Sequence, residues 1–241
     1  MSPRSAAVRH PWGCGRDVPG TTYRGNTPRV HPALGAEVMT PEAIRGEVIL
    51  AVAARVFLAH GYELSSMDEI ALEAGVARRT LYNQFVSKKA LFDATMARMW
   101  DATPLDAIVE ATAQVRPPED VLFSIGRTIA GFWAPPEAVV FMRLVIWESA
   151  RFPELGESFL QSGHEPVRQA VNRFVRRLSR EPEFRIDDPD LASAQFIDVI
   201  LGEVLLSRLV ATSTAALDEE RCNYVVREAV TLFMTRYRRR S

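Results

Sequence analysis

Cysteine is scarce in this sequence of 241 residues, and so is net charge. The two cysteines, Cys14 and Cys222, lie far apart, and neither belongs to a Cys-x-x-Cys pair or to the cysteine–histidine spacing of a zinc site. The sequence therefore predicts no disulfide framework and no metal centre. The formal net charge of −1, from 29 Lys and Arg against 30 Asp and Glu, by itself argues against a nucleic-acid partner, although an average over the chain can hide an uneven distribution.

Long apolar runs and enzyme motifs are missing as well. Residues 1–20 lack the apolar centre of a secretory signal, and charged residues interrupt the longest apolar stretch, 196–210, which is shorter than the about 20 apolar residues of a membrane span. No Gly-x-Ser-x-Gly, Walker loop, His-Glu-x-x-His or Gly-x-Gly-x-x-Gly pattern occurs. We therefore expect a cytoplasmic protein with no membrane partner, no catalytic residues and no cofactor.

The first 40 residues differ in composition from the rest of the chain. They contain five prolines, five glycines and five arginines, and they show no helical or strand period. Two interpretations remain open. Residues 1–40 form a disordered basic arm, or translation starts at Met39 and the first 38 residues are not part of the native protein.

Helix signals dominate from Thr40 onward, and strand-like alternation is absent. Thr40 is a candidate N-cap followed by Pro41, and the helix that they start should end at Gly61. Ser66 and Glu69 form a capping box before a second, short helix. Further helices are expected at about 77–85, from Ser87 onward, and at about 117–133, 135–152, 165–180, 189–212 and 218–237. We predict an all-α fold, in which three short helices precede a larger helical body.

The segment 66–89 holds the most informative pattern. Two short helices are joined by Ala74-Gly75-Val76, and a glycine in so short a turn is typical of a helix-turn-helix, because the chain there needs a positive φ. Between residues 76 and 100, five basic residues face one acid, a local excess of about +4, which an acidic excess in residues 101–235 offsets. Side chains that can donate to base edges and phosphates lie on the outer face of the second helix: Arg78, Arg79, Thr80 and Asn83.

This pattern resembles the N-terminal domain of TetR-type transcriptional regulators over residues 41–100. The residues that carry the resemblance are 49–53, Phe57, Gly61-Tyr62, Ser66-Met67-Asp68-Glu69-Ile70-Ala71, Ala74-Gly75-Val76, Thr80-Leu81-Tyr82, Phe85 and Ser87-Lys88-Lys89-Ala90-Leu91. The resemblance implies a homodimer on a double-stranded operator of two-fold symmetry. It also implies a C-terminal domain, residues 101–241, in which a small-molecule effector controls DNA affinity.

The resemblance further implies which residues contact DNA. The expected contacts are Ser66, Arg78, Arg79, Thr80, Tyr82, Asn83 and Lys88. Tyr82 and Lys88 would hold phosphates, and a phosphate would also explain a cation at the start of a helix, where it opposes the helix dipole. The likeness departs at Ala77, where the family usually has a Ser or Thr that caps the recognition helix; losing such a cap costs about 1 kcal/mol.

Aromatic side chains gather on neighbouring helices of the body, where the segment 142–155 resembles the AefR-like subgroup of C-terminal domains. Glu148 and His164 could supply polar contacts to a pocket, although single residues of these types are more often surface groups or satisfied core groups. Each aromatic residue could equally be ordinary core. The candidate ligand-binding residues, which would line an apolar effector pocket, are Phe123, Trp133, Phe141 and Trp147.

The helix expected at 189–212 is apolar nearly all round and therefore needs cover on every side. A partner subunit would supply this cover, with Gly202 allowing close approach at a two-fold axis, the helix at 218–237 completing a bundle of four helices, and Leu205 in the interface. The alternative is a helix buried within its own chain.

The sequence predicts a ligand-responsive transcriptional regulator, expected to be a repressor, that binds a palindromic operator as a homodimer. An apolar or amphipathic small molecule would release it from DNA. The main alternative is an all-α protein that sequesters small molecules and shows no dependence on DNA sequence.

Overall fold

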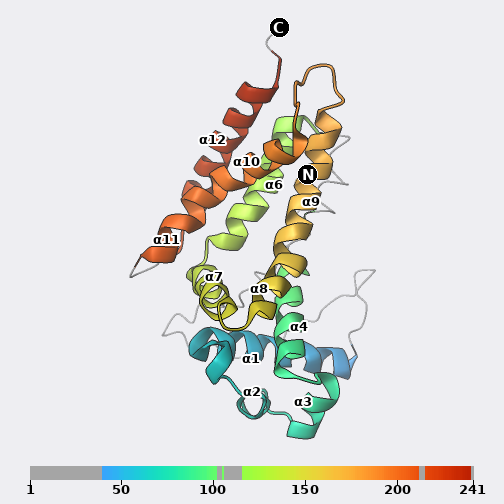
Figure 1. Ribbon diagram of the computed structural model, residues 1–241, viewed down its shortest axis with the longest axis vertical. Helices are drawn as coiled ribbons and strands as arrows, with labels where there is room; N and C mark the ends of the chain where they lie inside the picture. The colour runs from blue at the N-terminus through green and yellow to red at the C-terminus, as the bar shows by residue number, and fades with distance from the viewer. Residues whose placement is uncertain (1–39, 102–104, 106–115, 212–214, 240–241) are drawn as a thin grey trace, which may run out of the picture.

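The chain forms an elongated stack of helices in the computed structural model, which describes residues 40–101, 105, 116–211 and 215–239 (Figure 1). Over these residues there is no strand, and one isolated β-bridge pairs Phe184 with Arg238. The all-α prediction is therefore confirmed. The expected arm at residues 1–40 lies outside the described residues, except for Thr40.

Four helices form the lower end of the molecule in Figure 1. They are α1 (Pro41–Leu64), α2 (Met67–Glu73), α3 (Arg78–Gln84) and α4 (Lys88–Asp101). α1 packs against α2 and α4, and α3 packs against α2. α4 also contacts helices of the upper body, so it connects the two parts of the molecule.

Local capping explains why two of these helices begin where the sequence predicts. The hydroxyl of Thr40 accepts a hydrogen bond from the backbone nitrogen of Ala43 at 3.2 Å. Ser66 and Glu69 form the expected capping box at the start of α2, in which each side chain accepts from the backbone of the other residue. The first residue before α3, Ala77, makes no side-chain cap, as its sequence implies.

Two glycines shape the chain at the ends of α1 and α2. Gly61 has φ of 80° and Gly75 has φ of 65°, values that favour glycine because it has no Cβ atom. Gly75 makes the sharp turn between α2 and α3. Gly61 interrupts α1 rather than ending it, since one further turn of helix continues to Leu64.

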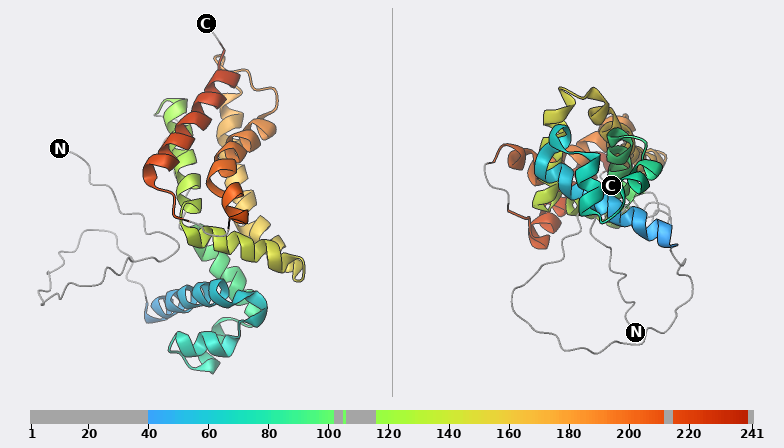
Figure 2. Two further views of the ribbon diagram at one scale, coloured as in Figure 1. Left: turned by 90° about the vertical axis from the view of Figure 1, so that its left-hand side faces the viewer. Right: turned by 90° about the horizontal axis from the view of Figure 1, so that it is seen from below.

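The upper body contains the remaining helices of the described residues. They are α6 (Pro118–Trp133), α7 (Pro136–Ser149), α8 (Pro153–Phe159), the π-helical turn η1 (Leu160–His164), α9 (Glu165–Leu178), α10 (Pro189–Leu201), the π-helical turn η2 (Gly202–Leu206), α11 (Ser207–Val210) and α12 (Glu219–Tyr237). α12 packs against α6 and α10, and α10 packs against α9. α7 lies across the top of α1 (Figure 2), and the two helices are in contact.

The helix expected at 189–212 differs from the prediction in two ways. It is divided into α10, η2 and α11, and the π-helical turn begins at Gly202, a residue with low helix propensity. It is also not apolar all round, because Asp198 and Glu203 lie on its exposed face. The opposite face is buried within the protomer, and Leu205 belongs to this buried face with 7 % of its surface exposed.

A single hydrophobic core runs through both parts of the molecule. Tyr62 at the end of α1 shows the continuity, because its ring lies 5.4 Å from that of Phe92 in α4 and 5.2 Å from that of Phe152, just before α8. The lower helices and the body therefore meet through packed side chains rather than through a bare linker.

Among the described helices, none alone combines the length and the apolar content of a membrane span. α6 and α7 reach both only when they are taken together, and the chain bends by 75° between them.

Candidate nucleic-acid interface

The turn between α2 and α3 fixes the angle between these helices. The backbone nitrogen of Val76 donates to the carbonyl oxygen of Ala71 at 3.0 Å, which closes the turn around Gly75. Ile70 and Leu81 have no exposed surface and fill the space between the two helices. The expected helix-turn-helix is therefore present.

The outer face of α3 carries the side chains that the sequence analysis assigns to DNA. Arg78, Arg79, Tyr82 and Asn83 are exposed, and Thr80 is half-buried. They come from one short helix, so a single flat partner could contact them together. This face has the donors that base edges and phosphates require.

The two arginines of α3 differ in how they are held. Arg78 pairs with Asp68 of α2 at 2.8 Å and lies over the ring of Tyr82, 5.4 Å from its centroid. Arg79 makes no hydrogen bond or ion pair with the residues that the structure describes. Because both partners of the Arg78–Asp68 pair are largely exposed, that ion pair is weak. Of the two arginines of α3, Arg79 is therefore the one without a competing partner among the described residues.

Ser66 has a structural role at the start of α2. Its hydroxyl oxygen accepts from the backbone nitrogen of Glu69 at 3.1 Å, and its own backbone nitrogen donates to the Glu69 carboxylate at 3.4 Å. The side chain is exposed beside the end of α1. Its position leaves room for a partner, but the cap already explains why a serine stands there.

Lys88 has protein partners that the sequence analysis did not foresee. Its Nζ donates to the carbonyl oxygens of Tyr62 at 2.7 Å, Glu63 at 3.1 Å and Ser65 at 3.0 Å, and it lies 4.5 Å from the centroid of the Tyr62 ring. Partial burial lowers the pKa of Lys88, and the carboxylates of Glu148 and Glu63 oppose this effect. The cation at the start of α4 therefore stabilises the end of α1, and no phosphate is needed to explain it.

The local basic excess is also smaller on the surface than the sequence suggests. Lys89 pairs with Asp93 at 2.6 Å, and Arg98 pairs with Glu47 at the same distance. With Lys88 on the carbonyl oxygens of α1, only the two arginines of α3 remain on the outer face. The candidate interface therefore depends on few charges, which favours contacts of defined geometry over general attraction.

Glu148 joins the body to the end of α1. Only 7 % of its surface is exposed, and its Oε1 accepts from the backbone nitrogens of Tyr62 at 2.9 Å and Glu63 at 3.2 Å. Arg151, at the end of α7, pairs with the Glu63 carboxylate. The segment 61–65 is thus held by α4 from one side and by α7 from the other.

The four candidate ligand-binding aromatics lie in different surroundings within the part of the chain that the structure describes. Trp133 is buried, 5.0 Å from the ring of Phe132. Phe123 is half-buried and packs against the core. Phe141 is buried in α7, whereas Trp147 in the same helix is 82 % exposed. Phe141 and Trp147 are six residues apart, which places them on different faces of α7.

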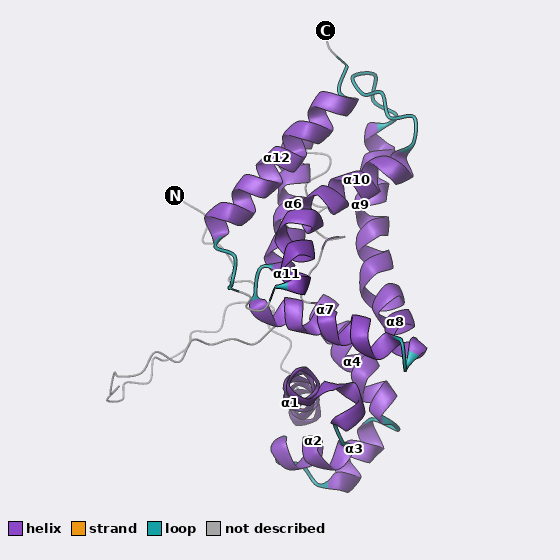
Figure 3. Cartoon of the chain, turned by 60° about the vertical axis from the view of Figure 1, so that its left-hand side comes forward, coloured by secondary structure: helices purple, strands orange, loops and turns teal. Residues whose placement is uncertain are grey.

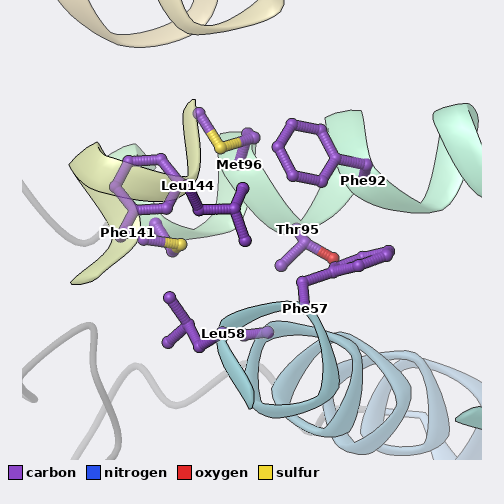
Figure 4. Close-up of a pocket in the computed structure, with 9 residues that line it drawn as sticks. Phe57, Leu58, Phe92, Thr95, Met96, Phe141 and Leu144 are labelled. Atoms are coloured by element: carbon purple, nitrogen blue, oxygen red, sulfur yellow. The ribbon is translucent and has the colours of Figure 1, made fainter. Parts of the chain in front are cut away.

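Phe141 borders a small cavity between α1, α4 and α7 (Figure 4). The side chains of Phe57, Phe92 and Leu144 surround it, and its volume is about 10 Å³. Such a volume holds about one water molecule at most. Thr95 contributes a hydroxyl to the lining, but this hydroxyl already donates to the carbonyl oxygen of Leu91. The cavity is therefore too small for an organic ligand, and the donor of this hydroxyl is already used.

Trp147 borders a larger, open groove, which the sequence analysis did not find. The groove lies between α1, α7 and α11, and its volume is about 670 Å³, within the usual range for small-molecule sites. In Figure 3, α7 runs between α1 and α11. A partial signal was present in the sequence: Glu148 and Phe141 are seven residues apart, on one face of α7, so this carboxylate was placed to be buried.

Comparisons with known proteins agree with this arrangement. A family model described as bacterial regulatory proteins of the tetR family matches residues 49–95. A second model, described as the C-terminal domain of AefR-like transcriptional repressors, matches residues 120–239. The two matches cover the helix-turn-helix and the helical body in the expected order.

Individual relatives match either a short part of the chain or most of it at low sequence identity. The helix-turn-helix transcriptional activator FasR of Mycolicibacterium smegmatis is 44 % identical over 57 residues, which are 24 % of this chain and 26 % of that protein. The match thus spans about a quarter of the relative's length. A TetR-family regulator from Mesorhizobium loti has the same fold, with a TM-score of 0.73 and 21 % identity over 83 % of this chain and 100 % of its own. The flavonoid-responsive regulator FrrA gives 0.61 and 27 % identity over 82 % of this chain and 99 % of its own.

Proposed function

Because this chain belongs to the TetR family of transcriptional regulators, with an AefR-like C-terminal domain, we propose that it binds operator DNA as a homodimer and that a small molecule controls this binding. The observation that carries the proposal is the exposed face of α3, where Arg79 has no partner among the described residues and stands beside Thr80 and Asn83. We assign no reaction to the chain, and we place its action in the cytoplasm, where its DNA target would be.

The residues of α3 divide into two roles under this proposal. Arg79, Thr80 and Asn83 read base edges in the major groove, and Tyr82 and Arg78 contact the phosphates beside it. Ser66 lies at the start of α2, where a phosphate can approach the helix N-terminus. Lys88 acts indirectly, because it holds the end of α1 on which α2 and α3 are mounted.

A homodimer is supported by the exposed apolar side chains of α10, η2, α11 and α12. Leu191, Val199 and Leu206 are 52 %, 42 % and 65 % exposed, and α12 adds Tyr224 and Leu232. Large apolar side chains that stay exposed on neighbouring helices of one protomer are a feature of interfaces between subunits. Paired with its copy, this face forms a bundle of four helices and would set two α3 helices about 34–36 Å apart, one turn of DNA.

We favour repression, although the relatives differ on this point. The AefR-like model that covers residues 120–239 is described as a transcriptional repressor, whereas FasR, which matches over 57 residues, is named an activator. The sign of regulation follows from where the operator lies, so a reporter gene behind the chain's own upstream region decides it. Deleting the regulator raises expression if it represses and lowers expression if it activates.

A DNA-binding assay tests the proposal itself. The full chain is titrated into labelled DNA from its own upstream region and into a shuffled sequence of equal length, at about 0.15 M salt. We expect binding of the upstream DNA that is at least about a thousandfold tighter, as is usual for specific sites. Equal binding of both sequences contradicts the proposal and favours a protein that only sequesters small molecules.

A further inference from the structure

The open groove between α1, α7 and α11 has the features of a binding site for a small molecule. Leu58 and Gly61 of α1 form one wall, Val140 and Trp147 of α7 form the floor, and Leu209 and Val210 of α11 form the other wall. Leu206, at the edge of this lining, belongs to the proposed dimer face. Three segments far apart in the sequence thus meet around one space. Its volume, about 670 Å³, accommodates an organic molecule of two or three rings.

Hydrogen bonds hold the α11 wall against α7. Arg143 of α7 donates from Nε to the carbonyl oxygen of Leu209 at 2.9 Å, and from Nη2 to those of Arg208 at 2.7 Å and Ala211 at 2.6 Å. These carbonyl oxygens lie at the C-terminus of α11, where a cation is favourable. The position of α11 relative to α7 is therefore fixed without any ligand.

The α1 wall is also held against α7 by hydrogen bonds, here through a carboxylate instead of a guanidinium. Glu148 accepts from the backbone nitrogens of Tyr62 and Glu63, immediately after Gly61. A Cβ atom at Gly61 would lie 2.9 Å from Glu148 Oε1, so the two chains already touch there. Since both walls are bound to α7 by backbone contacts, the groove is a preformed space rather than a gap between mobile helices.

The chemistry of the lining indicates which molecule fits. Trp147 and Val210 are 82 % and 87 % exposed, and their apolar surface gains most from removal of water. The two charged residues in the lining, Arg143 and Glu148, already bind backbone groups of opposite polarity. A charged ligand would lose its hydration and find no strong partner, whereas a neutral one loses little.

We propose that this groove binds an uncharged, mostly apolar molecule with a flat ring system that packs against the indole of Trp147. The regulatory part of the inference rests on the proposed function: because Leu58 and Gly61 belong to the helix that supports α2 and α3, a bound molecule acts on the DNA-binding end of the chain. It does so to the extent that its affinity differs between two positions of α1 relative to α7.

Two matched fluorescent probes test the binding step on the full chain without DNA. N-phenyl-1-naphthylamine is neutral and apolar, and 1-anilinonaphthalene-8-sulfonate has the same rings with an added negative charge. We expect saturable binding of the neutral probe at one molecule per chain, with an affinity at least about tenfold above that of the sulfonate. Equal or tighter binding of the sulfonate, or no saturable binding of the neutral probe, overturns the proposal.

Two variants locate the site. Trp147→Ala removes the exposed ring and should weaken binding of the neutral probe at least about tenfold, whereas Leu160→Ala, at a side chain that is 52 % exposed in η1, should leave binding within about twofold. Unchanged binding in the Trp147 variant places the probe elsewhere and contradicts the proposal. If that variant instead turns a dimer into a monomer in light scattering while the wild type binds no probe, a second copy covers the groove, and the ligand assignment is wrong.

The regulatory step has its own measurement. The neutral probe should change operator affinity of the wild-type chain and leave that of the Trp147 variant unchanged. If the chain binds probe but no operator, the proposed function fails while the binding site stands. If it binds both and the probe does not alter operator affinity, the regulatory part of the inference is wrong.

Discussion

The Oε1 atom of Glu148, near the C-terminus of α7, lies 2.9 Å from the backbone nitrogen of Tyr62 at the end of α1. The residues are 86 positions apart, and this contact joins α7 of the body to α1, the helix that packs against the helix-turn-helix. The carboxylate is buried and also accepts from the backbone nitrogen of Glu63. Hydrogen bonds to a charged acceptor in such a setting are stronger than bonds between neutral groups. The body and the DNA-binding part are thus joined by a hydrogen bond from a backbone nitrogen of α1 to a side-chain carboxylate of α7.

Replacing Glu148 should destabilise the chain. In Glu148→Ala, the backbone nitrogens of Tyr62 and Glu63 lose their acceptor in a buried setting, which should lower the free energy of unfolding by about 2–3 kcal/mol. Glu148→Gln keeps an acceptor oxygen and should lose about 1 kcal/mol. Urea unfolding followed by circular dichroism measures both. Glu157→Ala, at an exposed glutamate of α8, is the control and should change by less than about 0.5 kcal/mol. A similar loss in the control and in Glu148→Ala would contradict this role.

Lys88 should support the fold rather than hold a phosphate. Lys88→Met keeps the chain length but leaves the carbonyl oxygens of Tyr62, Glu63 and Ser65 without their donor, so we expect unfolding to become easier by about 1–3 kcal/mol. Lys89→Met breaks only a partly exposed pair with Asp93 and should have a much smaller effect. Thermal and urea unfolding distinguish the two. Unchanged stability of the Lys88 variant, with weaker DNA binding, would restore the phosphate assignment.

Arg79 should determine sequence preference. Arg79→Ala should weaken binding of the operator by about 1–3 kcal/mol, or about 5- to 150-fold, and weaken binding of shuffled DNA much less. Arg55→Ala serves as a control, because Arg55 is an exposed arginine of α1 that pairs with Glu73 at 3.0 Å. Fluorescence anisotropy with both DNA sequences gives the ratio. An equal loss on both sequences would mean that Arg79 contacts phosphate only.

Leu206 should lie in the dimer interface, and Leu205 should not. Leu206→Asp places a charge on a side chain that is 65 % exposed, so we expect monomers of normal stability. Leu205→Asp places the charge in the protomer core, where only 7 % of the leucine is exposed, and should unfold the chain instead. Light scattering reports the mass, and Leu160→Asp is an exposed control. A Leu206 variant that stays dimeric moves the interface to another surface.

Local sequence signals predicted the helix-turn-helix well. The capping box of Ser66 and Glu69, the turn at Gly75 and the burial of Leu81 depend on neighbours within a few residues, and all are present. The exposed arginines of α3 follow from the same local geometry. For this part of the molecule, spacing along the chain fixes which side chains lie outside.

Several features that the sequence did not reveal depend on contacts between residues far apart in the chain. Lys88 binds carbonyl oxygens 23 to 26 positions earlier, and nothing in the residues around it indicates this. Phe141 and Trp147 lie on different faces of α7, one buried and the other 82 % exposed, which a list of aromatic residues does not show. Leu205 and Leu206 were separable only once the buried face of η2 was known.

α7 is attached to α11 through Arg143 and to α1 through Glu148. This double attachment determines where mutations that alter regulation can arise. A mutation in α10 or α12 that tilts α11 should also displace α7, the helix that fixes the end of α1. Genetic screens for altered promoter control should therefore yield substitutions far from the DNA, together with compensating second-site changes on α7.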